Sequence, residues 1–179
     1  GIGAEYGVSL TTLISNTWTG EDLRSSLFAA NAPDLDSLNS HFQHYLLIPP
    51  VGGNVYAAEV TGTTDYGGAL VFSVGCHSGL NVPDEGSLSP QTGTDWPQAF
   101  LRQGATLVGN TGYGYGDSDL IAYSERLMLD FARQLNYGGE GPQTVGRALM
   151  RAKQFYYNSA SAGSLSNYDE KVLAETTLY

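Results

Sequence analysis

The stretch Ala69-Leu-Val-Phe-Ser-Val-Gly-Cys-His-Ser-Gly79 is the most informative part of this sequence. Residues 69–74 form a run that is apolar on both faces of a strand, and Gly75 ends it. Such a run is typical of a central strand in a parallel sheet that is covered on both sides. The segment therefore predicts a buried strand that delivers Cys76 to its carboxyl end.

The segments on either side of this strand predict an alternation of helices and strands. Apolar residues at helical spacing, and caps such as Thr19, predict helices over residues 19–30, 96–103, about 120–135 and a segment from about Pro142 to Tyr156. Shorter apolar or alternating runs predict strands at 35–40, 54–60 and 105–109. Because strands alternate with helices, we expect a single domain over residues 1–179, an α/β fold of three layers (α/β/α) with a mostly parallel sheet.

Composition excludes several classes of protein. The net charge of −10 argues against duplex nucleic acid as a partner, and it is compatible with cationic substrates. No run reaches the ~18 apolar residues of a membrane span. A single cysteine rules out an intrachain disulfide and a cysteine-rich zinc site. The richness in Gly (23) and Tyr (12) relative to Lys and Arg (8) suggests an extracellular or cell-envelope location.

Two strand ends carry reactive side chains. The predicted strand 35–40 runs into His41, and the predicted strand 69–74 runs through Gly75 into Cys76. Parallel sheets place ligands at the carboxyl ends of their strands, so neighbouring strands would present the two side chains together. A thiol needs such a partner, because with a pKa near 8.5 it is mostly protonated at neutral pH. The backbone amides of Cys76 and Phe42 are the candidate donors to an oxyanion.

The other histidines leave alternatives open. His44 lies three residues after His41 and takes its place if the strand ends elsewhere than predicted. His77 directly follows Cys76, and neighbouring residues point apart on a strand or tight turn, so it is a poor base for the thiol. A metal site formed by the three histidines is a further alternative, although the H-x-x-H spacing of His41 and His44 lies on no predicted helix.

Several motifs together resemble the gingipain family of cysteine peptidases, which has the caspase-haemoglobinase fold. The matching stretches are Ser40-His-Phe-Gln-His44, residues 69–79, 95–109, Thr111-Gly-Tyr-Gly-Tyr-Gly-Asp117, 123–127 and 146–156. The resemblance extends from about Trp18 to Tyr179. It implies hydrolysis of peptide or protein substrates by a Cys76–His41 dyad, after a charged or polar residue. No cofactor is expected for this chemistry.

The resemblance also assigns roles around the nucleophile. The segment Thr111 to Gly116 matches the loop that helps to form the substrate pocket, so Thr111, Tyr113 and Tyr115 are candidate substrate-binding residues together with Gly75. Asp117, with Asp119, is a candidate ligand of a basic substrate side chain or of a structural calcium ion; capping of a helix is the alternative role. We further expect the chain to be truncated at one or both ends and to associate with the remainder of a processed precursor.

Some residues depart from the family pattern. Phe42 follows His41 where many relatives have Gly, and the strand before His41 contains Asp36, Ser37 and Asn39 instead of aliphatic residues. A catalytically inactive binding or regulatory domain of the same fold is therefore the alternative interpretation. A hydrolase that transfers other acyl groups with the same two residues is a third.

Overall fold

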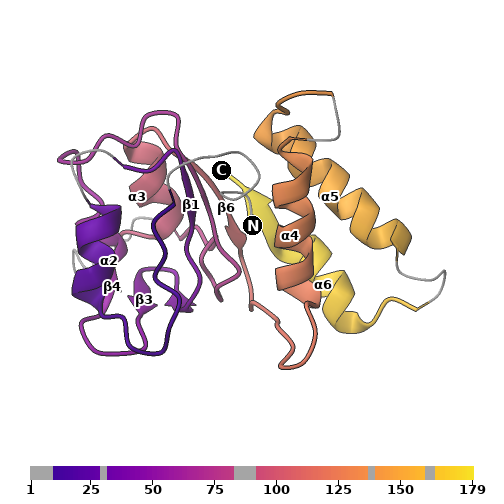
Figure 1. Ribbon diagram of the computed structural model, residues 1–179, viewed down its shortest axis with the longest axis horizontal. Helices are drawn as coiled ribbons and strands as arrows, with labels where there is room; N and C mark the ends of the chain where they lie inside the picture. The colour runs from indigo at the N-terminus through magenta and orange to yellow at the C-terminus, as the bar shows by residue number, and fades with distance from the viewer. Residues whose placement is uncertain (1–9, 29–31, 83–91, 137–139, 160–163) are drawn as a thin grey trace.

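The computed structural model describes residues 10–28, 32–82, 92–136, 140–159 and 164–179 (Figure 1). Its main sheet contains β1 (Leu35–Ser37), β5 (Leu70–Phe72), β6 (Thr106–Asn110) and β7 (Thr176–Leu178), in the order β1-β5-β6-β7. β1, β5 and β6 run parallel, and β7 pairs antiparallel with β6. The protein is therefore a mixed α/β fold with a mostly parallel sheet, as the sequence predicts.

Strand β5 lies inside the sheet and is buried on both faces. Val71 packs in the same apolar cluster as residues of α2 (Gly20–Leu27) and α3 (Trp96–Arg102). Leu70 and Phe72 point the other way, into a cluster with α4 (Tyr123–Gln134), α5 (Val145–Ser159) and α6 (Asn167–Glu175). Helices thus cover both faces of the sheet (Figure 1). This confirms the central, doubly covered strand that the run 69–74 predicts.

The predicted strand 35–40 is shorter in the structure. β1 ends at Ser37, and the Asn39 side chain then accepts a hydrogen bond from the Val74 amide at 3.0 Å, in place of a main-chain partner. His41 therefore does not lie at the end of this strand. It is instead the first residue of β2 (His41–Gln43), which belongs to a second sheet.

This second sheet is antiparallel and was not predicted. β2 pairs with β3 (Leu46–Ile48) through a turn at His44 and Tyr45, and β3 pairs with β4 (Val55–Tyr56). The predicted strand 54–60 stops at Tyr56 and continues as a 3-10 turn, η1 (Ala57–Glu59). The Glu59 carboxylate accepts hydrogen bonds from the Tyr56 amide and from Arg24, and these contacts close the turn.

Helix boundaries agree with the sequence in part. α2 begins after Thr19, whose side chain caps the helix as predicted and forms a capping box with Asp22. Residues 29 and 30 of the predicted helix lie outside the described residues. α3 matches its prediction closely, with Asp95 as its cap. α5 begins at Val145, later than predicted. Helix α6 and strand β7 were not predicted from the sequence.

Helix α4 begins at Tyr123 and excludes Leu120, contrary to the prediction. The Asp117 carboxylate accepts hydrogen bonds from the amides of Asp119 and Leu120, both at 2.9 Å, and so closes a turn before the helix. Leu120 is 71% exposed at this turn. Within the described part of the chain, no helix is both long and apolar enough to cross a membrane.

Candidate functional site

Cys76 lies in the turn that follows β5, at the carboxyl end of this strand. Its side chain is half-buried. The turn is fixed from inside by Ser73 and Ser78: the Gly75 amide donates to Ser73 Oγ at 2.9 Å, and Ser78 Oγ donates to the Gly75 carbonyl at 2.9 Å. The described residues provide no acceptor for the Cys76 amide itself. The predicted oxyanion donor is therefore an N–H group without a protein partner among them.

The β2 hairpin packs directly against this turn. A Cβ atom on Gly75 would lie 2.3 Å from Cδ2 of Phe42, so only glycine fits at this position. Phe42 is buried, and its ring makes an edge contact with the Trp96 ring at 5.6 Å between centroids. Gly75 and Phe42 are the chain neighbours of Cys76 and His41. Their contact therefore brings the segments that carry the predicted catalytic pair to the same edge of the sheet.

The loop of residues 111–116 covers the turn from the other side. A Cβ atom on Gly114 would lie 1.9 Å from the Val74 carbonyl oxygen, and the Gly114 carbonyl is the acceptor for the Cys76 thiol at 3.8 Å. Thr111 ties the start of the loop to α6, because its amide and hydroxyl both donate to the Glu175 carbonyl. The loop that the resemblance assigns to substrate binding therefore lies against Cys76.

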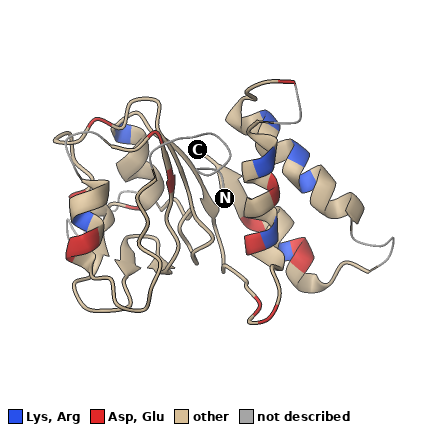
Figure 2. Ribbon diagram, in the orientation of Figure 1, with Lys and Arg blue, Asp and Glu red and all other residues tan. Residues whose placement is uncertain are grey.

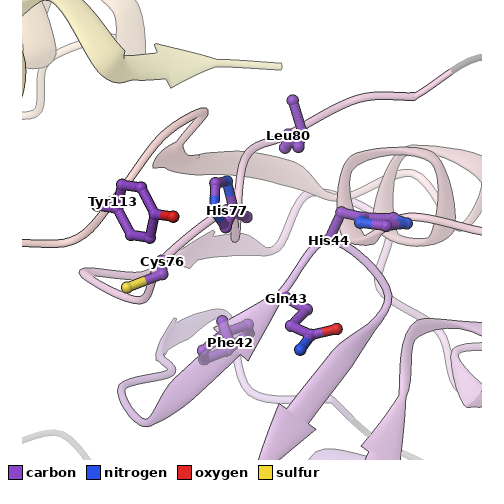
Figure 3. A pocket seen from close by; sticks show the side chains of 7 residues that line it. All are labelled: Phe42, Gln43, His44, Cys76, His77, Leu80 and Tyr113. Atoms are coloured by element: carbon purple, nitrogen blue, oxygen red, sulfur yellow. The ribbon is translucent and has the colours of Figure 1, made fainter.

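Next to Cys76 is an open cavity of about 420 Å³ (Figure 3). It is formed by the β2 hairpin, the turn after β5 and the loop 111–116, and is lined by Phe42, Gln43, His44, Cys76, His77, Leu80 and Tyr113. Tyr113 thus reaches the position predicted for it. Tyr115 does not line the cavity: its ring packs against Tyr168, with Lys171 also over its face.

Two of the three histidines line this cavity, and His41 is not one of them. In Figure 3 the Cys76 sulfur points away from the rings of His44 and His77. His41 is exposed at the start of β2, next to Phe42. No hydrogen bond joins Cys76 to a histidine within the described ranges. The pairing of His41 with Cys76 therefore stays a prediction.

His77 is held in an unusual conformation. Its φ of 56° lies in the left-handed region, which costs a non-glycine residue on the order of 1 kcal/mol. The His77 amide donates to the Gly112 carbonyl at 2.7 Å, Nδ1 lies 3.2 Å from the Thr111 carbonyl oxygen, and the ring contacts Tyr113. These contacts link the turn at Cys76 to the loop 111–116 and fix the ring of His77.

Asp117 lies outside the cavity and serves as the cap of its own turn. The part of the chain that the structure describes contains no group of three His, Cys, Asp or Glu side chains arranged to hold a metal ion. The alternative of a metal site at the three histidines thus has no geometric support there. A calcium ion at Asp117 and Asp119 stays a prediction, as does the Phe42 amide as the second oxyanion donor.

Asn110, the last residue of β6, was not predicted as a residue of the site. This side chain is 1% exposed, and its Nδ2 lies within 3.0 Å of the Val74 carbonyl and 3.4 Å of the Gly75 carbonyl. Its Oδ1 accepts a hydrogen bond from Thr176 Oγ1 at 2.9 Å. Asn110 therefore anchors the turn before Cys76 to β7. The sequence shows only an Asn after the apolar run 105–109, and its partner Thr176 lies 66 residues later, so no local pattern reveals this role.

Comparison with known proteins adds no further assignment. The chain matches no family model, no curated protein and no solved structure.

Proposed function

We propose that this protein is a cysteine peptidase in which Cys76 attacks the peptide carbonyl and His41 accepts the thiol proton. The observation that carries the proposal is the position of Cys76. Its thiol is half-buried at the carboxyl end of a central parallel strand, beside an open cavity, and its amide has no acceptor among the described residues. Parallel sheets bind their ligands at this edge. We further propose that the helices and the sheet form a three-layer, caspase-like sandwich.

The reaction follows from these groups. His41 takes the proton from the thiol, and the sulfur bonds to the carbonyl carbon of the peptide. The negative charge on the carbonyl oxygen is stabilised by the amides of Cys76 and Phe42. The C–N bond then breaks, and the departing amine takes the proton from the His41 imidazolium. Water attacks the resulting thioester, which releases the carboxylic acid and restores the thiol.

His41 is the proposed base for two reasons. The sulfur points away from the rings of His44 and His77 in Figure 3, and the His77 ring is held by the loop 111–116. His41 is exposed at the start of β2, and its neighbour Phe42 contacts Gly75, the residue before Cys76, so the segments that carry the two residues lie next to each other. Catalytic hydrogen bonds are often long or absent until substrate binds, so a missing hydrogen bond does not argue against the pair.

The experiment compares hydrolysis of a mixture of denatured proteins by the wild-type chain, Cys76→Ala, His41→Ala and His44→Ala. We expect Cys76→Ala and His41→Ala to lose at least 100-fold in rate, since general-base catalysis contributes about 10²–10⁴-fold, and His44→Ala to retain most of it. Loss in His44→Ala alone would move the base to His44. Equal rates in all four proteins, or no hydrolysis, would favour the inactive binding domain.

A further inference from the structure

We infer that the cavity beside Cys76 binds an uncharged side chain of the substrate, aromatic or aliphatic, next to the bond that is cleaved. This inference rests on the proposed function, because the bound side chain selects the cleaved bond only if the protein is a peptidase. It also differs from the expectation from sequence, which was a charged or polar residue at this position.

The walls of the cavity are mostly apolar or aromatic. Phe42 provides a buried ring on the hairpin side, Leu80 continues the turn after Cys76, and Tyr113 stands on the loop side. The polar groups are the amide of Gln43 and the rings of His44 and His77. Among the described residues, no Asp, Glu, Lys or Arg side chain lines the cavity. Figure 2 likewise shows the charged residues mainly on α2, α4, α5 and α6.

Two carboxylates on the segments that border the cavity belong to Asp95 and Asp117. Asp95 is fully buried, and its oxygens accept hydrogen bonds from the amides of Val82 and Gln98 at 2.7 and 2.8 Å. Asp117, the residue predicted to meet a basic side chain, accepts the two amides of its own turn. Asp95 is therefore not available to a substrate cation, and Asp117 does not line the cavity.

The energetics favour an uncharged occupant. A charged group that leaves water without an opposite charge costs several kcal/mol, whereas burial of a Leu- or Phe-sized side chain contributes about 1.5–3 kcal/mol. Tyr113 is 60% exposed, so most of its ring is open to contact with a bound side chain. Its edge contact with His77, at 4.9 Å between ring centroids, holds the ring at the mouth of the cavity. Tyr113 is thus the residue on which specificity depends most directly.

The first measurement identifies cleavage sites in a random peptide library by mass spectrometry. We expect Phe, Tyr, Leu or Met to be enriched at one fixed position beside the cleaved bond. Tyr113→Ala is expected to reduce that enrichment about tenfold, and Tyr113→Asp to shift the preference toward Lys and Arg. Tyr157→Ala is the matched control, because Tyr157 is 61% exposed on α5 and outside the cavity. Enrichment of Lys, Arg, Asp or Glu by the wild-type chain would overturn the inference and leave the peptidase proposal intact.

A second measurement tests peptide binding to the cavity in a variant without the nucleophile. The Cys76→Ala chain is titrated with acetylated tripeptide amides that end in Phe or in Arg, and the NMR signals of Tyr113 and His77 are followed. We expect the Phe peptide to shift these signals at an at least tenfold lower concentration than the Arg peptide. This result together with no hydrolysis by the wild-type chain would refute the peptidase and retain the cavity specificity. Tighter binding of Arg, or binding of neither peptide, would refute the specificity.

Discussion

The ring of Phe42 fills the space that a side chain at position 75 would occupy, with Cδ2 of Phe42 2.3 Å from the position of a Cβ atom on Gly75. This contact joins two parts of the chain that belong to different sheets. Cys76 follows Gly75 on the turn after β5, and His41 precedes Phe42 on β2. The relative position of the nucleophile and its proposed base therefore depends on a contact that only glycine permits.

We expect Gly75→Ala to destabilise the fold and to move the turn at Cys76. Phe42 is buried against Trp96 and cannot move aside, so overpacking of this kind costs about 1–3 kcal/mol in the free energy of unfolding. Chemical denaturation measures the loss. The control is Gly146→Ala on α5, where a Cβ atom meets its nearest neighbour at an ordinary 3.5 Å and helix propensity favours alanine.

The same contact predicts an interaction between two substitutions. Phe42→Leu shortens the side chain that blocks position 75. This substitution should therefore lower the free energy of unfolding less in the Gly75→Ala variant than in the wild-type chain. A double-mutant cycle on unfolding free energies is expected to give a coupling of about 1 kcal/mol or more. Additive losses would show that the two residues do not share this space.

Gly114 is a second position where the site tolerates no side chain. A Cβ atom there would lie 1.9 Å from the Val74 carbonyl oxygen, which belongs to the backbone and cannot yield. We expect Gly114→Ala to lift the loop 111–116 from Cys76 and to abolish peptide hydrolysis. Gly116→Ala, two residues further along the same loop, meets only the flexible end of Glu125 at 3.4 Å and should keep at least half of the activity. Equal activity in the two variants would contradict the placement of the loop.

Asp36 makes the stability of the fold depend on pH. Burial raises the pKa of this carboxyl to about 7, and its Oδ2 has no hydrogen-bond partner within the described residues. The folded protein therefore holds a proton that the unfolded chain, with a pKa near 3.9, releases earlier. The contribution of Asp36 is most favourable below about pH 4, and stability is lost as the pH rises toward 7.

We accordingly expect Asp36→Asn to stabilise the protein increasingly between pH 5 and pH 8. At pH 8 the gain in the free energy of unfolding should be roughly 2 kcal/mol. A pKa shift of about three units corresponds to ~4 kcal/mol, and the gain is smaller because part of the Asp36 side chain reaches solvent. Urea denaturation at both pH values measures it, and Asp34→Asn, an exposed carboxyl two residues earlier, is the control. The same gain at both pH values would contradict the raised pKa.

The sequence predicted the centre of the fold better than its edges. The run 69–74 and the cap at Thr19 carry local signals, and the structure confirms the central strand and the start of α2. β1 is only three residues long, because the side chain of Asn39 replaces a main-chain partner for Val74. That contact joins residues 35 positions apart in the chain, so no local pattern reveals it.

The candidate site was likewise predicted only in part, because some of its contacts join residues that are far apart in the chain. Cys76 at a strand end and Tyr113 at the cavity follow from strand order and from the resemblance, and the structure places both as expected. The position of His41 depended on the end of the strand before it, which was predicted wrongly. The role of Asn110 depends on its hydrogen bond with Thr176, 66 residues later in the chain, so no local sequence pattern predicts it.

The reactivity of the Cys76 thiol depends on whether His41 activates it. The chain contains one cysteine, so alkylation by iodoacetamide reports on this residue alone. We predict that the second-order rate constant at pH 7 is about tenfold or more higher in the wild-type chain than in His41→Ala, because the His41 imidazole takes the thiol proton as the sulfur attacks. Equal rate constants in the two proteins would mean that His41 does not activate Cys76 and that the proposed pair does not exist.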